Sequence, residues 1–154
     1  MKDIFAVFVV ARATDHQGMF AATTRAKDRG ESGRIGLPGG KVDEGESLVA
    51  AALREASEEG WDVVGLNPSP IHTSQVDGKH IAWLEAEGAS VKETFKEEGR
   101  IRPVAVPLAD IAQSGWGNDF LWDRIKIDAR TREGAARITN ILLKTRENFR
   151  KATE

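Results

Sequence analysis

The segment LPGGKVDEGESLVAAALREASEEG, residues 37–60, constrains the fold most, because it joins a glycine-rich loop to a helix with clustered acidic side chains. Over residues 46–59 apolar positions recur at helical spacing, and the final glycine is well placed to end the helix in a left-handed conformation. Glu55, Glu58 and Glu59 are spaced three and four residues apart, so a helix presents them on one face.

Repulsion among these carboxylates predicts that a cation compensates them, since the helix dipole also disfavours negative charge in the last turn. The donors are all oxygens, and no cysteine or histidine lies within the segment. Such donors suit a hard divalent ion, Mg²⁺ or Mn²⁺, better than zinc. We therefore expect the chemistry of the protein to lie here.

The rest of the chain predicts an α+β or mixed α/β fold, because strands and helices alternate along it. Its 154 residues, 40% apolar and 30% charged, fit one globular domain over 1–154. We expect loops at 27–36 and 87–100, with tight turns at 15–18 and 77–78. Strands are expected at 4–12, 19–26, 62–66, 71–76, 80–85 and 102–106, and further helices at 107–113 and 133–149, the last packing its apolar stripe against a sheet.

Charge and composition narrow the function classes. A formal charge of −2 argues against nonspecific binding to nucleic acid or to a membrane. The apolar run Ile4–Val10 is too short to span a bilayer and is a poor signal peptide. The chain has no cysteine, which excludes disulfides and agrees with a reducing compartment. These features predict a cytoplasmic protein.

The spacing of the signature residues resembles that of a known family. Gly40 is followed after five residues by Glu46, and after seven more by Arg54-Glu55-Ala56-Ser57-Glu58-Glu59. This resembles the signature of the Nudix (MutT-like) hydrolases, a glycine, five residues, a glutamate, seven residues, then R-E-U-x-E-E-x-G-U, where U is a bulky aliphatic residue. The resemblance implies an α/β/α sandwich with a mixed sheet between helices. The chain departs from the signature at Gly60-Trp61-Asp62, where the glycine comes one residue early.

The resemblance also implies roles for individual residues. Glu58 and Glu59 would be the primary ligands of Mg²⁺ or Mn²⁺, with the backbone carbonyl of Gly39 completing the coordination. Glu55 would lie nearest the attacking water, as ligand or general base. Arg54 would orient the carboxylates by charge-assisted hydrogen bonds, and Glu46 would support the loop.

Further candidates lie outside the signature. The resemblance implies that a further glutamate, from a later loop, can join the site; in the acidic loop we favour Glu98 before Glu97, because Gly99 follows Glu98 and lets the backbone turn. For phosphate binding the candidates are Arg25, Arg34 and Lys41, with Arg25 preferred, although Arg25 and Arg34 could instead form surface ion pairs. Asn118, between Trp116 and Trp122, is the candidate for contact with a base, although each tryptophan is more often a packing residue.

The predicted function is a metal-dependent pyrophosphohydrolase that cleaves a nucleoside diphosphate linked to another group. The first choice of substrate is a nucleoside or deoxynucleoside triphosphate, yielding the monophosphate and pyrophosphate. The alternatives are ADP-ribose, a dinucleoside polyphosphate, the 5′ end of an RNA, or a non-catalytic domain that binds or senses nucleotides. Family members often form homodimers, but no stripe in this sequence identifies an interface.

Overall fold

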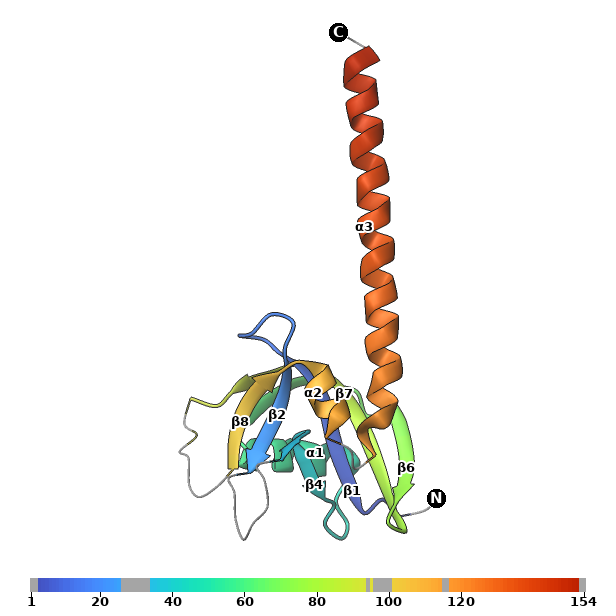
Figure 1. Cartoon of the computed structure of the whole chain (residues 1–154). Coiled ribbons are helices and arrows are strands. Elements are labelled where there is room, and N and C mark those ends of the chain that lie inside the picture. Colours follow the sequence, from blue (N-terminus) through green and yellow to red (C-terminus); the bar gives the residue numbers. More distant parts are fainter. Residues whose placement is uncertain (1–2, 26–33, 94, 96–100, 115–116, 153–154) are drawn as a thin grey trace. The chain divides into compact units, whose positions relative to one another are not determined.

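The computed structural model describes residues 3–25, 34–93, 95, 101–114 and 117–152. The chain divides into two compact units, residues 1–120 and 121–154. In the first unit the described elements alternate as the sequence predicts, and Figure 1 shows strands and short helices gathered there. They are, in chain order, β1 (Ala6–Ala13), β2 (Phe20–Arg25), β3 (Ile35–Gly36), β4 (Gly39–Lys41), α1 (Leu48–Glu58), β5 (Trp61–Leu66), β6 (His72–Val76), β7 (Lys79–Val91), β8 (Ile101–Val106), α2 (Leu108–Gln113) and a 3₁₀ turn, η1 (Asn118–Phe120).

The strands form one mixed sheet, which confirms the predicted α+β class. Its main path runs β3-β2-β1-β7-β5, with β4 paired to β1, β6 to β7 and β8 to β2. The pairing of β1 with β7 is parallel, whereas the other pairs are antiparallel. As a central strand buried along most of its length, β1 explains the nearly continuous apolar run near the N-terminus.

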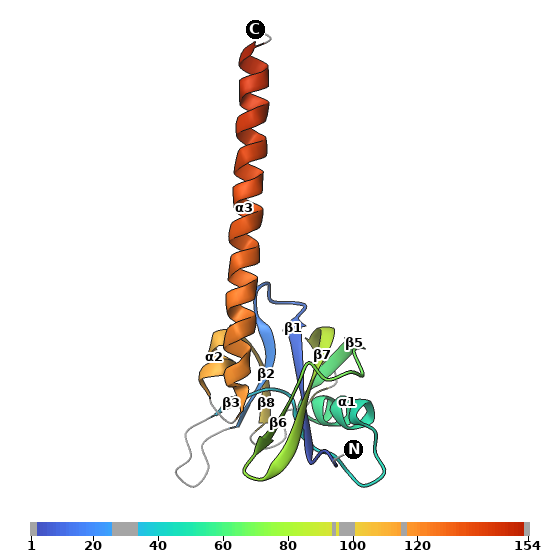
Figure 2. The same cartoon turned by 90° about the vertical axis from the view of Figure 1, so that its right-hand side faces the viewer.

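Helix α1 packs against this sheet, contacting β1, β4 and β5 (Figure 2). Three small residues, Ala51, Ala52 and Ala56, face the core and are fully buried. They lie against apolar side chains of the sheet, among them Val7 of β1 and Leu84 of β7. Alanine at these positions brings the helix close to the sheet, so the opposite, charged face stays outside.

Most predicted elements are present, with three differences. The segment 27–36 was expected to be a loop, but Ile35–Gly36 forms β3 and pairs with β2. The glycine-rich loop contributes Gly39–Lys41 as β4. The expected loop at 87–100 begins later, because β7 continues to Val91 between β1 and β5. The charged residues of β7 obscured this strand, since composition alone does not show that Ala86, Gly88 and Ala89 are buried.

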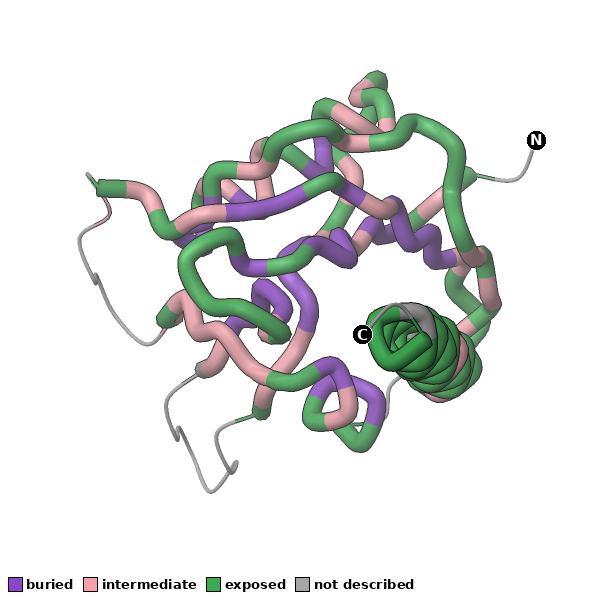
Figure 3. Tube along the Cα trace, turned by 90° about the horizontal axis from the view of Figure 1, so that it is seen from above, coloured by how far each residue is buried: buried purple, intermediate pink, exposed green. Residues whose placement is uncertain are grey.

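The second unit contains α3 (Leu121–Ala152), which is nearly twice as long as the helix expected at 133–149. Ile138 and Leu142 of its apolar stripe are 61% and 65% exposed, and the packing of this stripe against a sheet stays a prediction. Figure 3 colours most of this helix as exposed. A helical period establishes that one face is apolar, but it does not establish what covers that face. Within the described residues no helix is both long and apolar enough to cross a membrane.

Candidate active site

Local signals at both ends of α1 determine where its acidic residues lie. The side chain of Ser47 caps the first turn by accepting a hydrogen bond from the backbone N–H of Ala50 at 3.1 Å. At the other end, Gly60 has φ +95°, as predicted for a residue that ends the helix. The chain then enters β5 at once with Trp61, so the early glycine in the signature produces a short helix exit.

The glycines of β4 allow the carboxylates of α1 to approach the backbone. A Cβ atom on Gly40 would lie 2.6 Å from the carboxyl carbon of Glu55, and one on Gly39 would lie 2.2 Å from the carbonyl oxygen of Val7. A side chain at Gly39 would collide with the backbone of β1, and one at Gly40 would push the Glu55 carboxylate aside. Two adjacent glycines therefore let β1 and the Glu55 side chain approach β4 closely.

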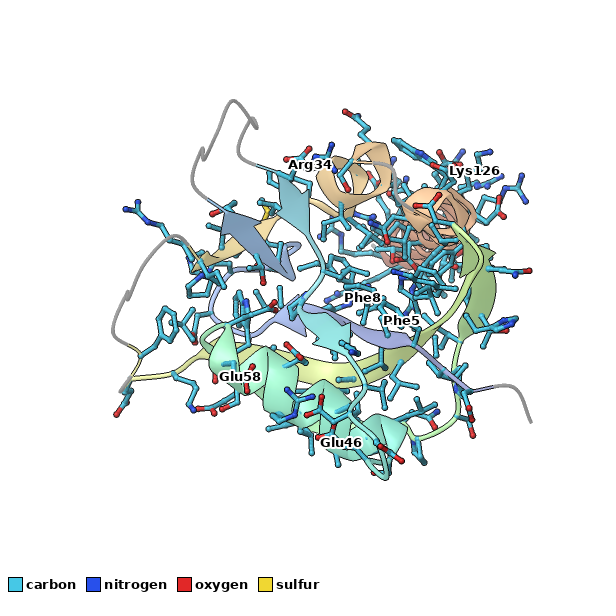
Figure 4. The ribbon with its side chains drawn as sticks, turned by 90° about the horizontal axis from the view of Figure 1, so that it is seen from below. Phe5, Phe8, Arg34, Glu46, Glu58 and Lys126 are labelled. Atoms are coloured by element: carbon cyan, nitrogen blue, oxygen red, sulfur yellow. The ribbon has the colours of Figure 1, made fainter. Side chains whose placement is uncertain are left out.

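Arg54 is the centre of an ion-pair network on the outer side of α1. Its guanidinium donates two hydrogen bonds to Glu46, Nε–Oε2 at 2.8 Å and Nη2–Oε1 at 2.9 Å. Its Nη1 donates to Glu55 at 3.0 Å and to Glu58 at 3.4 Å. Its Nη2 also donates to the carbonyl oxygen of Lys41 at 3.0 Å. One arginine thus ties the β4 loop to Glu46, Glu55 and Glu58. Figure 4 labels two of these glutamates, Glu46 and Glu58, beside α1.

This network shifts the protonation of its members. The side-chain hydrogen bond from Arg54, helped by the backbone N–H of Asp43, lowers the pKa of Glu46 from 4.5 to about 2. The same bond to Glu46, followed by that to Glu55, raises the pKa of Arg54 above its already high value. Glu46 therefore stays ionised over the whole physiological range and holds the arginine fork in place.

Glu59 is held differently, in the interior. It is only 5% exposed. Its Oε2 accepts hydrogen bonds from the backbone N–H of Gly39 at 3.0 Å and from the hydroxyl of Thr23 at 3.2 Å. Strands β2 and β4 therefore both orient this carboxylate.

A pocket of about 410 Å³ opens beside Glu59. Of the predicted site residues, it brings together Gly39, Glu59, Arg34 and Asn118, which come from distant parts of the sequence. The remaining lining residues are Phe8, Thr23, Ile35, Gly36, Leu37 and Ser114.

Sequence reasoning missed Thr23, Phe8 and Ser114 as pocket residues. Each belongs to an element that looks purely structural in the sequence, a strand or a helix end. The available signal for Thr23 was its polarity, because it follows the apolar residues Ala21 and Ala22 within a buried strand.

Asn118 lines the pocket with a constrained side chain. It is 6% exposed, and its Oδ1 accepts a hydrogen bond from the indole N–H of Trp83 at 3.3 Å. Trp83 is itself fully buried and contacts Phe120 and His72, so it packs in the core. Trp61 is also buried, with its indole N–H donating to the carbonyl oxygen of Ala22 at 2.9 Å.

Other predicted site residues are not brought into this pocket by the described structure. Lys41 is exposed, and its ammonium lies 5.9 Å from the ring centroid of Phe5. The backbone of Arg25 ends β2, but its side chain lies outside the described part of the chain. Glu97 and Glu98 also lie outside the described residues.

The donor chemistry fits a hard divalent ion, whereas the described side chains do not form a complete ligand set. Glu59 lies beside the backbone of Gly39 and Glu55 beside Gly40, and Glu55 and Glu58 accept hydrogen bonds from the same nitrogen of Arg54. Among the residues that the structure describes, no three acidic or histidine side chains stand close enough together to hold a metal ion. An ion that binds would have to bring the three carboxylates closer together.

Comparison with solved structures supports the fold. A MutT structure reported for Aliivibrio salmonicida and Vibrio cholerae has 25% identity and a TM-score of 0.52, over 73% of this chain and 86% of that one. MutT from Methanosarcina mazei Go1 has 25% identity and a TM-score of 0.50, over 82% and 94%. An ADP compounds hydrolase has 23% identity and a TM-score of 0.52, over 68% of this chain but only 57% of its own length. No curated protein shows significant similarity to the chain.

The fold and these similarities define the class of the protein, a hydrolase that acts on phosphorus-containing acid anhydrides. The model of the NUDIX domain family matches residues 3–121, well over half of the chain. The chain therefore belongs to the Nudix family. Nudix hydrolases act on nucleotide substrates and generally use divalent metal ions.

Proposed function

We propose that the protein is a metal-dependent pyrophosphohydrolase whose first substrate class is the nucleoside and deoxynucleoside triphosphates. The observation that carries the proposal is the convergence of Glu59, Gly39, Arg34 and Asn118 on one pocket. This arrangement offers a metal-binding end and a polar wall within a single cavity. We assign the activity to one domain over 1–154, of which the family model matches 3–121.

In this proposal Glu55, Glu58, Glu59 and the carbonyl oxygen of Gly39 hold Mg²⁺ or Mn²⁺. When bound, the ion neutralises phosphate charge and acts as a Lewis acid. Arg54 keeps the carboxylates of Glu55 and Glu58 on the same side of α1, as its hydrogen bonds already do.

The chain's own residues then handle the proton and the phosphates. Glu55 takes a proton from the attacking water while a new P–O bond forms and the bridging P–O bond breaks. The products are the nucleoside monophosphate and pyrophosphate. Arg34, exposed at the rim of the pocket, binds phosphate oxygens, and Asn118 contacts the base. Arg25, Lys41 and Glu98 stay predictions, as do the homodimer and the cytoplasmic location.

The test is a product-resolved screen of the purified protein with Mg²⁺ and with Mn²⁺. The panel contains nucleoside and deoxynucleoside triphosphates, ADP-ribose, a dinucleoside tetraphosphate and 5′-triphosphorylated RNA. We expect turnover of triphosphates to monophosphate plus pyrophosphate. Preference for another member of the panel would replace the substrate class and leave the metal site intact. Thermal stabilisation by nucleotides without turnover would support the non-catalytic alternative instead.

Glu58→Gln and Glu59→Gln test whether the signature carries this activity. Both should lower the rate by orders of magnitude. The exposed loop residue Glu44 provides a matched control, because Glu44→Gln removes a nearby carboxylate that has no role in the proposed site. Rates equal to wild type in both site variants would overturn the assignment.

A further inference from the structure

Thr23 places a buried hydroxyl beside Glu59. It is 5% exposed, and its Oγ1 donates a hydrogen bond to Oε2 of Glu59 at 3.2 Å. The same oxygen accepts the backbone N–H of Gly39 at 3.0 Å. Two donors on one carboxylate oxygen restrict rotation of the carboxylate about its terminal bond. They therefore determine how Glu59 faces the pocket that both side chains line.

The position of Thr23 in the sheet does not by itself require a hydroxyl. Thr23 pairs with Gly36 of β3 and with Pro103 of β8, and its neighbours Ala21 and Ala22 are fully buried. A valine has nearly the same shape and suits a buried strand equally well. The hydroxyl would be costly to bury without a partner, and Glu59 supplies one.

The same strand also holds the helix exit that follows Glu59. The indole N–H of Trp61 donates to the carbonyl oxygen of Ala22 at 2.9 Å, one residue before Thr23. Trp61 is part of the Gly60-Trp61-Asp62 sequence in which the chain departs from the family signature. Strand β2 thus contacts Glu59 through the Thr23 side chain and the segment that follows Glu59 through the Ala22 backbone.

We propose that Thr23 is a positioning residue, which orients the Glu59 carboxylate for binding a divalent ion. This inference rests on the proposed function, because it gives Glu59 a ligand role. Thr23 acts through its hydrogen bond to the Glu59 carboxylate.

Thr23→Val tests the proposal, because it removes the hydroxyl and preserves the shape. Outer-shell partners of this kind typically change metal affinity or activity by about 10- to 100-fold. We expect the affinity for Mn²⁺, measured by electron paramagnetic resonance without nucleotide, to fall by about 10- to 100-fold. We also expect the fold-decrease in kcat to exceed the fold-change in KM for the nucleotide. Thr23→Ser, which retains the hydroxyl, should restore most of the affinity. If the valine variant unfolds at a lower temperature than wild type, Thr23→Ala gives the same comparison.

Two controls separate positioning from a structural effect. Thr24→Val changes the next residue of β2, which alternation places on the opposite face, and should leave Mn²⁺ affinity unchanged. In a Glu59→Gln background, Thr23→Val should have little further effect, because the carboxylate that it orients is gone. Wild-type Mn²⁺ affinity in Thr23→Val, or an undiminished effect in the Glu59→Gln background, would overturn the role of Thr23. Failure of the wild-type protein itself to bind Mn²⁺ would overturn the proposed function.

Discussion

The two ends of the signature helix hold their glutamates in opposite ways. Before the helix starts, Glu46 forms a two-pronged ion pair with Arg54. At the far end Glu59 is buried, and two uncharged donors, a hydroxyl and a backbone N–H, hold its Oε2. Arg54 fixes Glu46 on the outer side of the helix, whereas strands β2 and β4 fix the Glu59 carboxylate in the interior, beside the pocket. In the proposed function the first carboxylate supports the loop and the second is a metal ligand.

The largest loss of activity should come from a change at the buried Glu59. Glu59→Gln keeps the hydrogen-bonding shape and removes the charge. We expect a loss of turnover greater than the about 10- to 100-fold typical of residues that only support a ligand. Steady-state kinetics across the nucleotide panel measures this loss, with circular dichroism confirming that the variant is folded. A loss confined to KM would contradict a metal-ligand role for Glu59.

The second effect should come from the Arg54 network. Arg54→Lys keeps one positive charge but cannot form the two-pronged pair with Glu46 while also reaching Glu55 and Glu58. We expect kcat to fall by about 10- to 100-fold, because both acidic side chains lose their orientation. Steady-state kinetics of Arg54→Lys measures this loss, with Lys79→Arg, which keeps the charge at an exposed position outside the proposed site, as the control. Equal activity in Arg54→Lys and wild type would show that the charge alone is sufficient.

The third prediction concerns the pH dependence of stability, which should arise from the Glu46–Arg54 ion pair. Because Arg54 lowers the pKa of Glu46 from 4.5 to about 2, the ion pair stabilises the folded state above pH 4.5. That stabilisation is lost as the pH falls from 4.5 through about 2. The difference in unfolding free energy between wild type and Glu46→Gln should therefore be constant above pH 5 and shrink below pH 4.5. Urea denaturation at a series of pH values measures it. A difference independent of pH would contradict the ion pair.

The smallest change should come from Ser47, the residue that caps the start of α1. Ser47→Ala removes the side-chain acceptor of the Ala50 N–H and should lower the unfolding free energy by about 1 kcal/mol. Ser47→Asp, which keeps an acceptor, should retain wild-type stability. Denaturation midpoints measure both, and turnover should change little, because neither variant touches Arg54 or Glu59. A large loss of activity in Ser47→Ala would mean that the start of α1 positions the catalytic end.

The elements that sequence predicted well are those defined by local signals. The helix 46–59 was confirmed as α1, only slightly shorter, because its apolar period, its cap and Gly60 are all local. The turn at Asp77-Gly78 was confirmed as well, with both residues at positive φ. The short strands β3 and β4 were missed, because two or three residues carry no periodicity and become strands only by pairing with β2 and β1.

The features of the site likewise divide into those set by local sequence and those set by tertiary contacts. Spacing along one helix was enough to place Glu55, Glu58 and Glu59 within the same two turns, because the geometry of a helix is local. The sequence by itself therefore determined the family, the acidic cluster and its oxygen-rich donor chemistry. Only the tertiary structure decided that Glu59 is the buried member and that Thr23 and Gly39 orient it. The physical reason is that β2, β4 and α1 meet through strand pairing and core packing, which join residues far apart in the chain.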